Sequence, residues 1–124
     1  MVRPEIVTTQ IDDSLWVIRL QGEHDISTAH HLRREVDRLF ETGTGVVVDL
    51  TGATFIDSSI LGELIRAYLG ATPDEKVAIV GPLGRGAAAR LFDVVDATRT
   101  CFPVFESLDA AVGWCSGEAL LPAS

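Results

Sequence analysis

Apolar and polar side chains follow two different periods along this chain. Five short runs rich in β-branched and apolar residues are bounded by turn-forming residues, which is the pattern of strands. The polar turn 12–14 separates the first two runs and predicts a hairpin, and the continuous apolar run 46–50 predicts a central strand covered on both faces. Pro103 suits an edge strand because it has no amide donor. The expected strands cover residues 6–11, 15–20, 46–50, 77–80 and 102–105.

Four further segments have apolar residues at spacings of three and four, which predicts helices. The first helix follows a break in the pattern at 22–25, with Asp25 among its plausible N-caps, and stops before Gly43. A weaker third helix covers 87–95, and Ser107 caps the last helix. The inward stripe of the second helix is expected to comprise Leu61, Leu64, Ile65, Tyr68 and Leu69.

An opening hairpin followed by alternating helices and strands predicts an α/β layer fold. The sheet is expected to be mixed and mostly parallel, with about five strands and about four helices. The 124 residues suit one domain, which we place at residues 4–117, followed by a C-terminal tail at 118–124. The sequence has no internal repeat or linker that would mark a second domain.

The acidic balance of the chain narrows the choice of partners. A net charge of −8 offers no counter-charge to nucleic acid or to an anionic membrane, so neither is expected. No signal peptide follows Met1, and no run approaches the roughly 18 apolar residues that span a bilayer, so we expect a cytoplasmic protein. Cys101 and Cys115 make neither a disulfide framework nor a metal site. A buried thiol at Cys115 is favoured over a redox switch between the two.

The start of the second helix carries an acid and two hydroxyls, Asp57, Ser58 and Ser59. A phosphate on Ser58 would accept hydrogen bonds from the unpaired amides at the helix start, and it adds roughly −1.5 to −2 charge. Asp25 lies close to it if the loop after the second strand reaches the same sheet edge. Burying such a dianion beside carboxylates costs several kcal/mol. The tripeptide therefore fits a phosphorylation switch, although by itself it is more simply explained as an ordinary N-cap.

Other residues that suggest chemistry are better explained as structural. His30 and His31 are neighbours on a helix and point about 100° apart, so together with His24 they indicate a solvated face rather than a metal site. The loop Gly81–Gly86 stands between a strand and a helix, as a phosphate-binding loop does, but lacks the Lys-Ser/Thr ending. We therefore expect an ordinary turn there. No cofactor, metal or catalytic set is expected.

Four ordered blocks carry a resemblance to a known family. They are Gly-Glu-His-Asp at 22–25, Val-Val-Asp-Leu-Thr at 47–51, Phe-Ile-Asp-Ser-Ser at 55–59 with Leu61-Gly62, and Arg-Leu-Phe-Asp at 90–93. The chain resembles the bacterial anti-sigma factor antagonists, which are built on the STAS domain. The resemblance implies a partner that is both an anti-sigma factor and a serine kinase, and binding to it releases a sigma factor. Phosphorylation ends the binding, and a separate phosphatase restores it.

The resemblance also implies roles for particular residues. Ser58 becomes the phosphoacceptor, and the protein is a substrate rather than an enzyme. Where the family usually has glycine, this chain has Ile60, which either extends the core stripe or alters the choice of partner. His24 stands where the family often has an apolar residue. The expected partner-binding residues are Asp25, Asp57, Ser59, Ile60, Gly62, Glu63 and Arg66.

Two alternatives to this function stay open at the level of sequence. In the first alternative, the domain is an interaction module of another assembly, such as a stress-signalling complex or a lipid-transport system. Such a module keeps the fold without the switch. Alternatively, it is a nucleotide-binding protein that uses the loop Gly81–Gly86. We expect a monomer or a weak dimer in either case.

Overall fold

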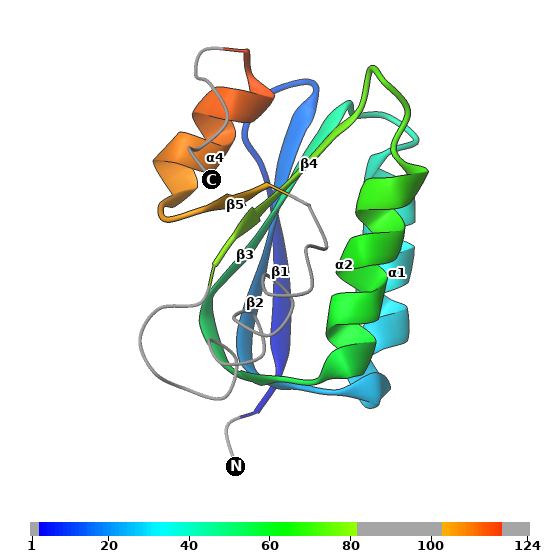
Figure 1. Cartoon of the computed structure of the whole chain (residues 1–124), viewed down its shortest axis with the longest axis vertical. Coiled ribbons are helices and arrows are strands. Elements are labelled where there is room, and N and C mark those ends of the chain that lie inside the picture. The colour runs from blue at the N-terminus through cyan, green and yellow to red at the C-terminus, as the bar shows by residue number, and fades with distance from the viewer. Residues whose placement is uncertain (1–2, 82–102, 118–124) are drawn as a thin grey trace.

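A computed structural model describes residues 3–81 and 103–117 of the chain. The described strands form one sheet in the order β1-β2-β3-β4-β5, in which β1 pairs antiparallel with β2 and all other neighbours are parallel (Figure 1). The elements are β1 (Glu5–Gln10), β2 (Leu15–His24), α1 (Ile26–Leu39), β3 (Gly45–Ile56), α2 (Ser58–Gly70), β4 (Lys76–Val80), β5 (Val104–Phe105) and α4 (Leu108–Cys115).

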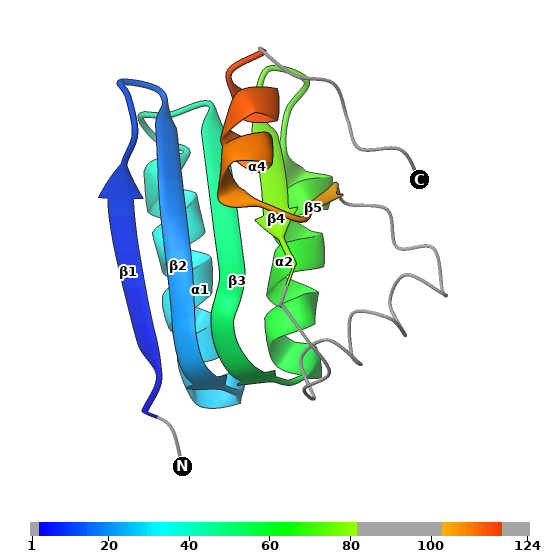
Figure 2. The same ribbon diagram turned by 90° about the vertical axis from the view of Figure 1, so that its left-hand side faces the viewer.

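The helices cover the two faces of the sheet unequally. α1 and α2 lie side by side on one face, and α4 lies on the other (Figures 1 and 2). The larger core cluster joins β2, β3 and β4 to α1 and α2, and a smaller one packs Phe105 and Ala111 against the opposite face. The predicted opening hairpin and mostly parallel α/β sheet are confirmed. The helix expected over 87–95 lies outside the described residues.

The inward stripe expected for α2 is confirmed at four of its five positions, since Leu61 and Leu64 are buried and Ile65 and Tyr68 pack partly buried against the core. The buried residues of α1 also follow helical spacing and are Ala29, Leu32, Val36 and Leu39. Leu69 was expected to face inward but is 74% exposed. The buried residues of α2 are Ile60, Leu61, Leu64 and Ala67. α2 starts two residues after Ile56, whose side chain lies in the core, so the short connection sets the rotation of the helix. The spacing of apolar residues predicts how wide the buried face of α2 is, whereas the short connection from β3 decides which residues form that face.

β2 and β3 continue beyond the ends predicted from sequence. The pattern placed a break at 22–25 and a polar loop after residue 50, but β2 runs to His24 and β3 runs to Ile56. Register shifts accompany the extension, and Gly22 adopts a φ of 84°, a left-handed conformation that glycine adopts without strain. The extension pairs His24 with Ile56 at the carboxyl edge of the sheet. This pairing brings the following loops together.

The single cysteine in the described part of the chain lies at the end of α4. Cys115 is half-buried, and this burial raises the pKa of its thiol to about 11. Because the thiol stays protonated near neutral pH, it is a weak nucleophile. Cys101 lies outside the described residues, so a pairing of the two cysteines stays untested.

Candidate functional site

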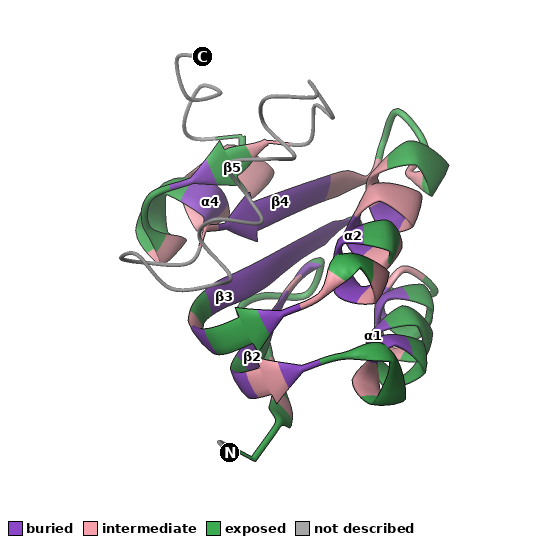
Figure 3. Cartoon of the chain, turned by 60° about the horizontal axis from the view of Figure 1, so that its bottom comes forward, coloured by how far each residue is buried: buried purple, intermediate pink, exposed green. Residues whose placement is uncertain are grey.

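Two strand-to-helix turns lie next to each other at the carboxyl edge of the sheet. Asp25 follows His24 and caps α1, while Asp57 follows Ile56 and caps α2. Because His24 and Ile56 are register partners, the two caps start from adjacent points of the sheet. Figure 3 shows the connections from β2 to α1 and from β3 to α2 running side by side. The expected proximity of Asp25 to the start of α2 follows from this arrangement.

The turn at Asp57 distinguishes its two serines. The Asp57 carboxylate accepts hydrogen bonds from the Ser59 amide (3.0 Å), the Ser59 hydroxyl (2.5 Å) and the Ile60 amide (3.4 Å). Ser59 is half-buried and its hydroxyl is therefore occupied. Ser58 is exposed at the first position of α2, and its hydroxyl forms no hydrogen bond with any other residue that the structure describes. Ser58 is thus the accessible hydroxyl of this turn.

The turn at Asp25 supplies a second carboxylate. Asp25 accepts hydrogen bonds from the amide and the hydroxyl of Ser27, at 2.8 Å and 2.5 Å, and is exposed. The Ser27 hydroxyl, followed by the Ser27 amide and the charge of the nearby His24, lowers the pKa of Asp25 below its ordinary value of 3.8. The carboxylate is therefore ionised at neutral pH, and the surface beside Ser58 is acidic.

Farther along α2, the expected contact residues separate into two groups. Gly62 is exposed, and apart from its chain neighbours and the backbone of its own helix no heavy atom lies within 4 Å of the position that a Cβ would take there. Arg66 bonds Glu63 at 3.0 Å and reaches Asp37 of α1 at 3.4 Å. Partial burial opposes the charge of Arg66, but hydrogen bonds and the charges of these two acids outweigh it and raise its pKa. Arg66 therefore joins α2 to α1 and lines a cavity of about 260 Å³, while Glu63 holds the Arg66 side chain from within α2.

The assignment of Ile60 to the partner surface is wrong. Its side chain is 0% exposed and belongs to the core cluster with Leu64 and Ile56. The first of the two possibilities for this residue therefore holds, and Ile60 extends the buried stripe. Because it does not reach the surface, it gives no reason to expect an altered choice of partner.

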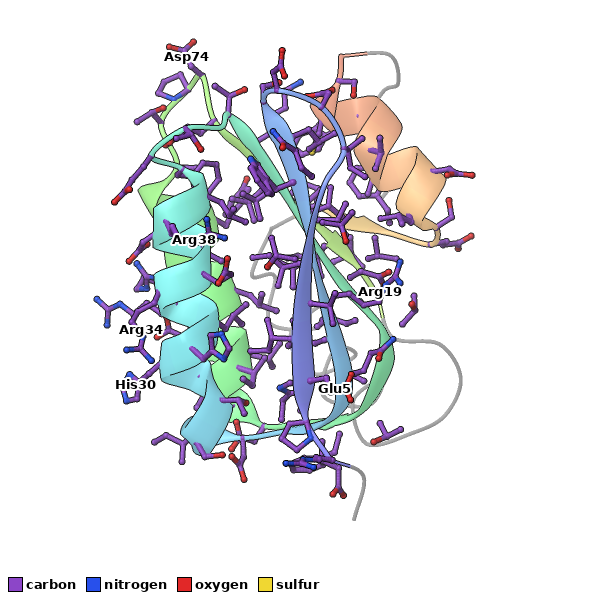
Figure 4. The ribbon with its side chains drawn as sticks, turned by 180° about the vertical axis from the view of Figure 1, so that it is seen from behind. Glu5, Arg19, His30, Arg34, Arg38 and Asp74 are labelled. Carbon is purple, nitrogen blue, oxygen red and sulfur yellow. The ribbon has the colours of Figure 1, made fainter. Side chains whose placement is uncertain are left out.

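The solvated position expected for His24 is also wrong. His24 is 0% exposed, with Nδ1 3.0 Å from Thr28 Oγ1 and Nε2 2.8 Å from the Gln21 carbonyl. His30 and His31 are exposed as expected, and His30 points away from the sheet (Figure 4). The alternation of Leu20, Gly22 and His24 was a period-two signal for a buried end of β2.

The described residues include no group of three or more His, Cys, Asp or Glu side chains that could hold a metal ion. Among the helices in those same parts of the chain, none has the length and apolar character needed to cross a bilayer. The loop Gly81–Gly86 is described only at Gly81, so its proposed role in nucleotide binding is untested.

Comparisons with known proteins agree with this architecture. A family model for the STAS domain matches residues 6–111. An anti-sigma factor antagonist from Mycobacterium paratuberculosis has a TM-score of 0.75 at 23% identity, over 92% of this chain and 95% of that one. The Bacillus cell fate determinant SpoIIAA in its phosphorylated form has a TM-score of 0.67 at 14% identity, over 89% of this chain and 98% of its own. No curated protein matches the chain. The STAS-like fold expected from sequence is confirmed.

Proposed function

The chain belongs to the STAS domain family, and we propose that it is an anti-sigma factor antagonist controlled by phosphorylation of Ser58. It binds an anti-sigma factor that is also a serine kinase and so releases a sigma factor in the cytoplasm. Phosphate transfer from ATP to Ser58 ends the binding, and a phosphatase restores it. The protein is a binding module and a substrate in this cycle, with no catalytic role of its own.

The difference between Ser58 and Ser59 is the observation that carries the proposal. Ser58 is exposed, with a hydroxyl that no other described residue engages, whereas the Ser59 hydroxyl is held by Asp57 at 2.5 Å. A kinase needs an acceptor hydroxyl that is exposed and is not held by another residue of the substrate, so that it can enter the kinase active site. Ser58 meets this requirement without loss of the cap, and Ser59 does not.

The electrostatics of the turn support release of the partner after phosphorylation. The positive end of the α2 dipole favours a phosphate on Ser58, and Asp57 still holds the Ser59 and Ile60 amides, so the modified protein keeps its fold. The added charge of roughly −1.5 to −2 stands beside Asp57 and near Asp25. A partner that docks here must then bury a dianion among carboxylates, and a loss of about 1.4 kcal/mol already weakens binding tenfold.

The unmodified surface fits a partner with a basic contact region. Asp25 and Asp57 supply negative charge, Ser58 supplies an accessible hydroxyl beside Ser59, and Gly62 leaves room for a close backbone approach. Charge complementarity of this kind favours fast association and specificity. Arg66 contributes by fixing α2 against Asp37 of α1, and Glu63 contributes by holding the Arg66 side chain.

The proposal is tested in three steps. The partner is recovered from lysate, the complex is incubated with ATP, and the phosphate is mapped by mass spectrometry. We expect a kinase as partner and phosphate on Ser58. Ser58→Ala should keep binding and block phosphorylation, and Ser58→Asp should weaken binding at least about tenfold. Ser59→Ala is the matched control and should still be phosphorylated. Phosphate confined to Ser59 or to a threonine would refute the assignment.

A further inference from the structure

The two turns differ in the pair of side chains that closes each strand-to-helix junction. In the α2 turn, Ile56 and Ile60 form an apolar pair that is 1% and 0% exposed. In the α1 turn, the matching positions hold His24 and Thr28, which contact each other at 3.0 Å. The α2 turn demonstrates that an apolar pair closes such a junction. Packing alone therefore does not call for an imidazole at this position.

The three polar contacts around His24 can all be hydrogen bonds at the same time only when the ring is charged. Nε2 lies 2.8 Å from the Gln21 carbonyl, Nδ1 lies 3.0 Å from Thr28 Oγ1, and that hydroxyl lies 3.1 Å from the Asp25 carbonyl. Carbonyl oxygens only accept, so these three bonds need hydrogens on Nε2, on the hydroxyl and on Nδ1. A neutral histidine and one hydroxyl bring two hydrogens, while the imidazolium and the hydroxyl bring three.

We propose that His24 is a positioning residue for the Asp25 turn, acting through the Thr28 hydroxyl according to its protonation. In the neutral state Nε2 donates to Gln21, and the Thr28 hydroxyl donates to Nδ1. When Nδ1 takes up a proton from solvent, it becomes the donor, and the hydroxyl turns to the Asp25 carbonyl. No other bond forms or breaks.

Charged and titratable residues accompany His24 on each neighbouring segment. The ring itself is completely buried. The charge of His24 helps to lower the pKa of Asp25, so the two groups interact. By register or sequence position, the other charged or titratable residues on the adjoining segments are Arg3 and Glu5 of the β1 segment, Glu23 of β2, His31 of α1, and Asp57 after β3.

The consequence for partner binding rests on the proposed function. A proton on His24 adds one positive charge beneath the surface beside Ser58. It also adds a third donor to the Asp25 carbonyl, which already accepts from the amides of Thr28 and Ala29. A basic partner should therefore bind about threefold more weakly when His24 is charged, the effect of one surface charge pair.

A pH titration of the intact protein by NMR tests the relay without any partner. Between pH 5 and 8, where imidazoles titrate, the amides of Thr28 and Ala29 should shift with the same midpoint as the His24 ring. They share the Asp25 carbonyl with the hydroxyl, so they report its rotation. The Leu61 amide, bonded to the Asp57 carbonyl at 3.3 Å, is the control in the other turn and should not move. A His24 ring that stays unchanged over this range would overturn the inference.

Variants separate the relay from packing. In Thr28→Val the two amides should lose their dependence on His24, and in Thr28→Ser they should keep it. The double variant His24→Ile, Thr28→Ile copies the α2 turn and should remain folded. With the kinase recovered above as probe, wild-type binding should weaken about threefold from pH 7.5 to 5.5, and the double variant should show no such change. Equal pH dependence in both proteins overturns the positioning role, while absence of any kinase partner removes the proposed function and leaves the NMR result standing.

Discussion

The β2–α1 and β3–α2 turns have one backbone plan and two sets of side chains. Each begins with an aspartate that caps the helix and binds the amide and hydroxyl of the serine two residues later, in Ser27 and Ser59. The residue between them is Ile26 in the first turn and Ser58 in the second, and both are exposed. The same cap therefore presents an inert side chain in one turn and a phosphorylatable hydroxyl in the other.

The comparison separates residues that build the turn from residues that give it a function. The aspartate and the following serine occur in both turns, which explains them as capping residues. Ser58 occurs in one turn, and so does the His24–Thr28 pair. Variants at these positions show whether each side chain builds the turn or gives it a function.

The largest effect is expected at the core position of the α2 turn. Ile60→Ala should lower the free energy of unfolding by about 2–5 kcal/mol, because it leaves a cavity at a fully buried site. Urea unfolding measures this loss. The matching change in the other turn, Thr28→Ala, should have a smaller effect since Thr28 is half-buried. An Ile60→Ala protein as stable as wild type would place this side chain outside the core.

The cap of α2 comes next. Asp57→Ala removes the acceptor of three hydrogen bonds and should lower the free energy of unfolding by about 1–2 kcal/mol. Asp57→Asn keeps an oxygen acceptor and is the matched control, expected to lose less. Equal loss in the two variants would show that charge, rather than capping geometry, is what Asp57 supplies.

The two serines of the α2 turn should then differ in stability. Ser59→Ala removes the hydroxyl bond to Asp57 and should lower the free energy of unfolding by about 0.5–1.5 kcal/mol. Ser58→Ala should change it by less than about 0.5 kcal/mol, since that hydroxyl bonds no other described residue. Chemical denaturation of the two variants measures both changes in the free energy of unfolding. A reversed order would mean that Ser58, not Ser59, completes the cap.

The smallest effect concerns the acid behaviour of the α1 cap. Since folding lowers the pKa of Asp25, its contribution to stability is complete above the ordinary value of 3.8 and is lost as pH falls through the lower folded value. Ser27→Ala removes the largest cause of the shift, so the pKa of Asp25 should rise toward 3.8. Carboxyl NMR titration measures both proteins. Identical titration curves would assign the shift to the Ser27 amide and His24.

Local features of the chain were predictable because they depend on neighbouring residues. The opening hairpin, the aspartate and serine caps, and the inward stripe of α1 follow from turn chemistry and helical spacing. The position of Ser58 at the first turn of a helix follows in the same way. These features would be expected whatever the rest of the fold.

The sequence by itself thus determined the order of elements, the caps and the candidate acceptor. The tertiary structure decided how far β2 and β3 extend, which brings Asp25 beside the Asp57 turn, and which way α2 faces, which buries Ile60. It also decided the burial of His24 against Thr28. The physical reason is that register and helix rotation depend on pairing and packing between segments distant in sequence, which no local periodicity encodes.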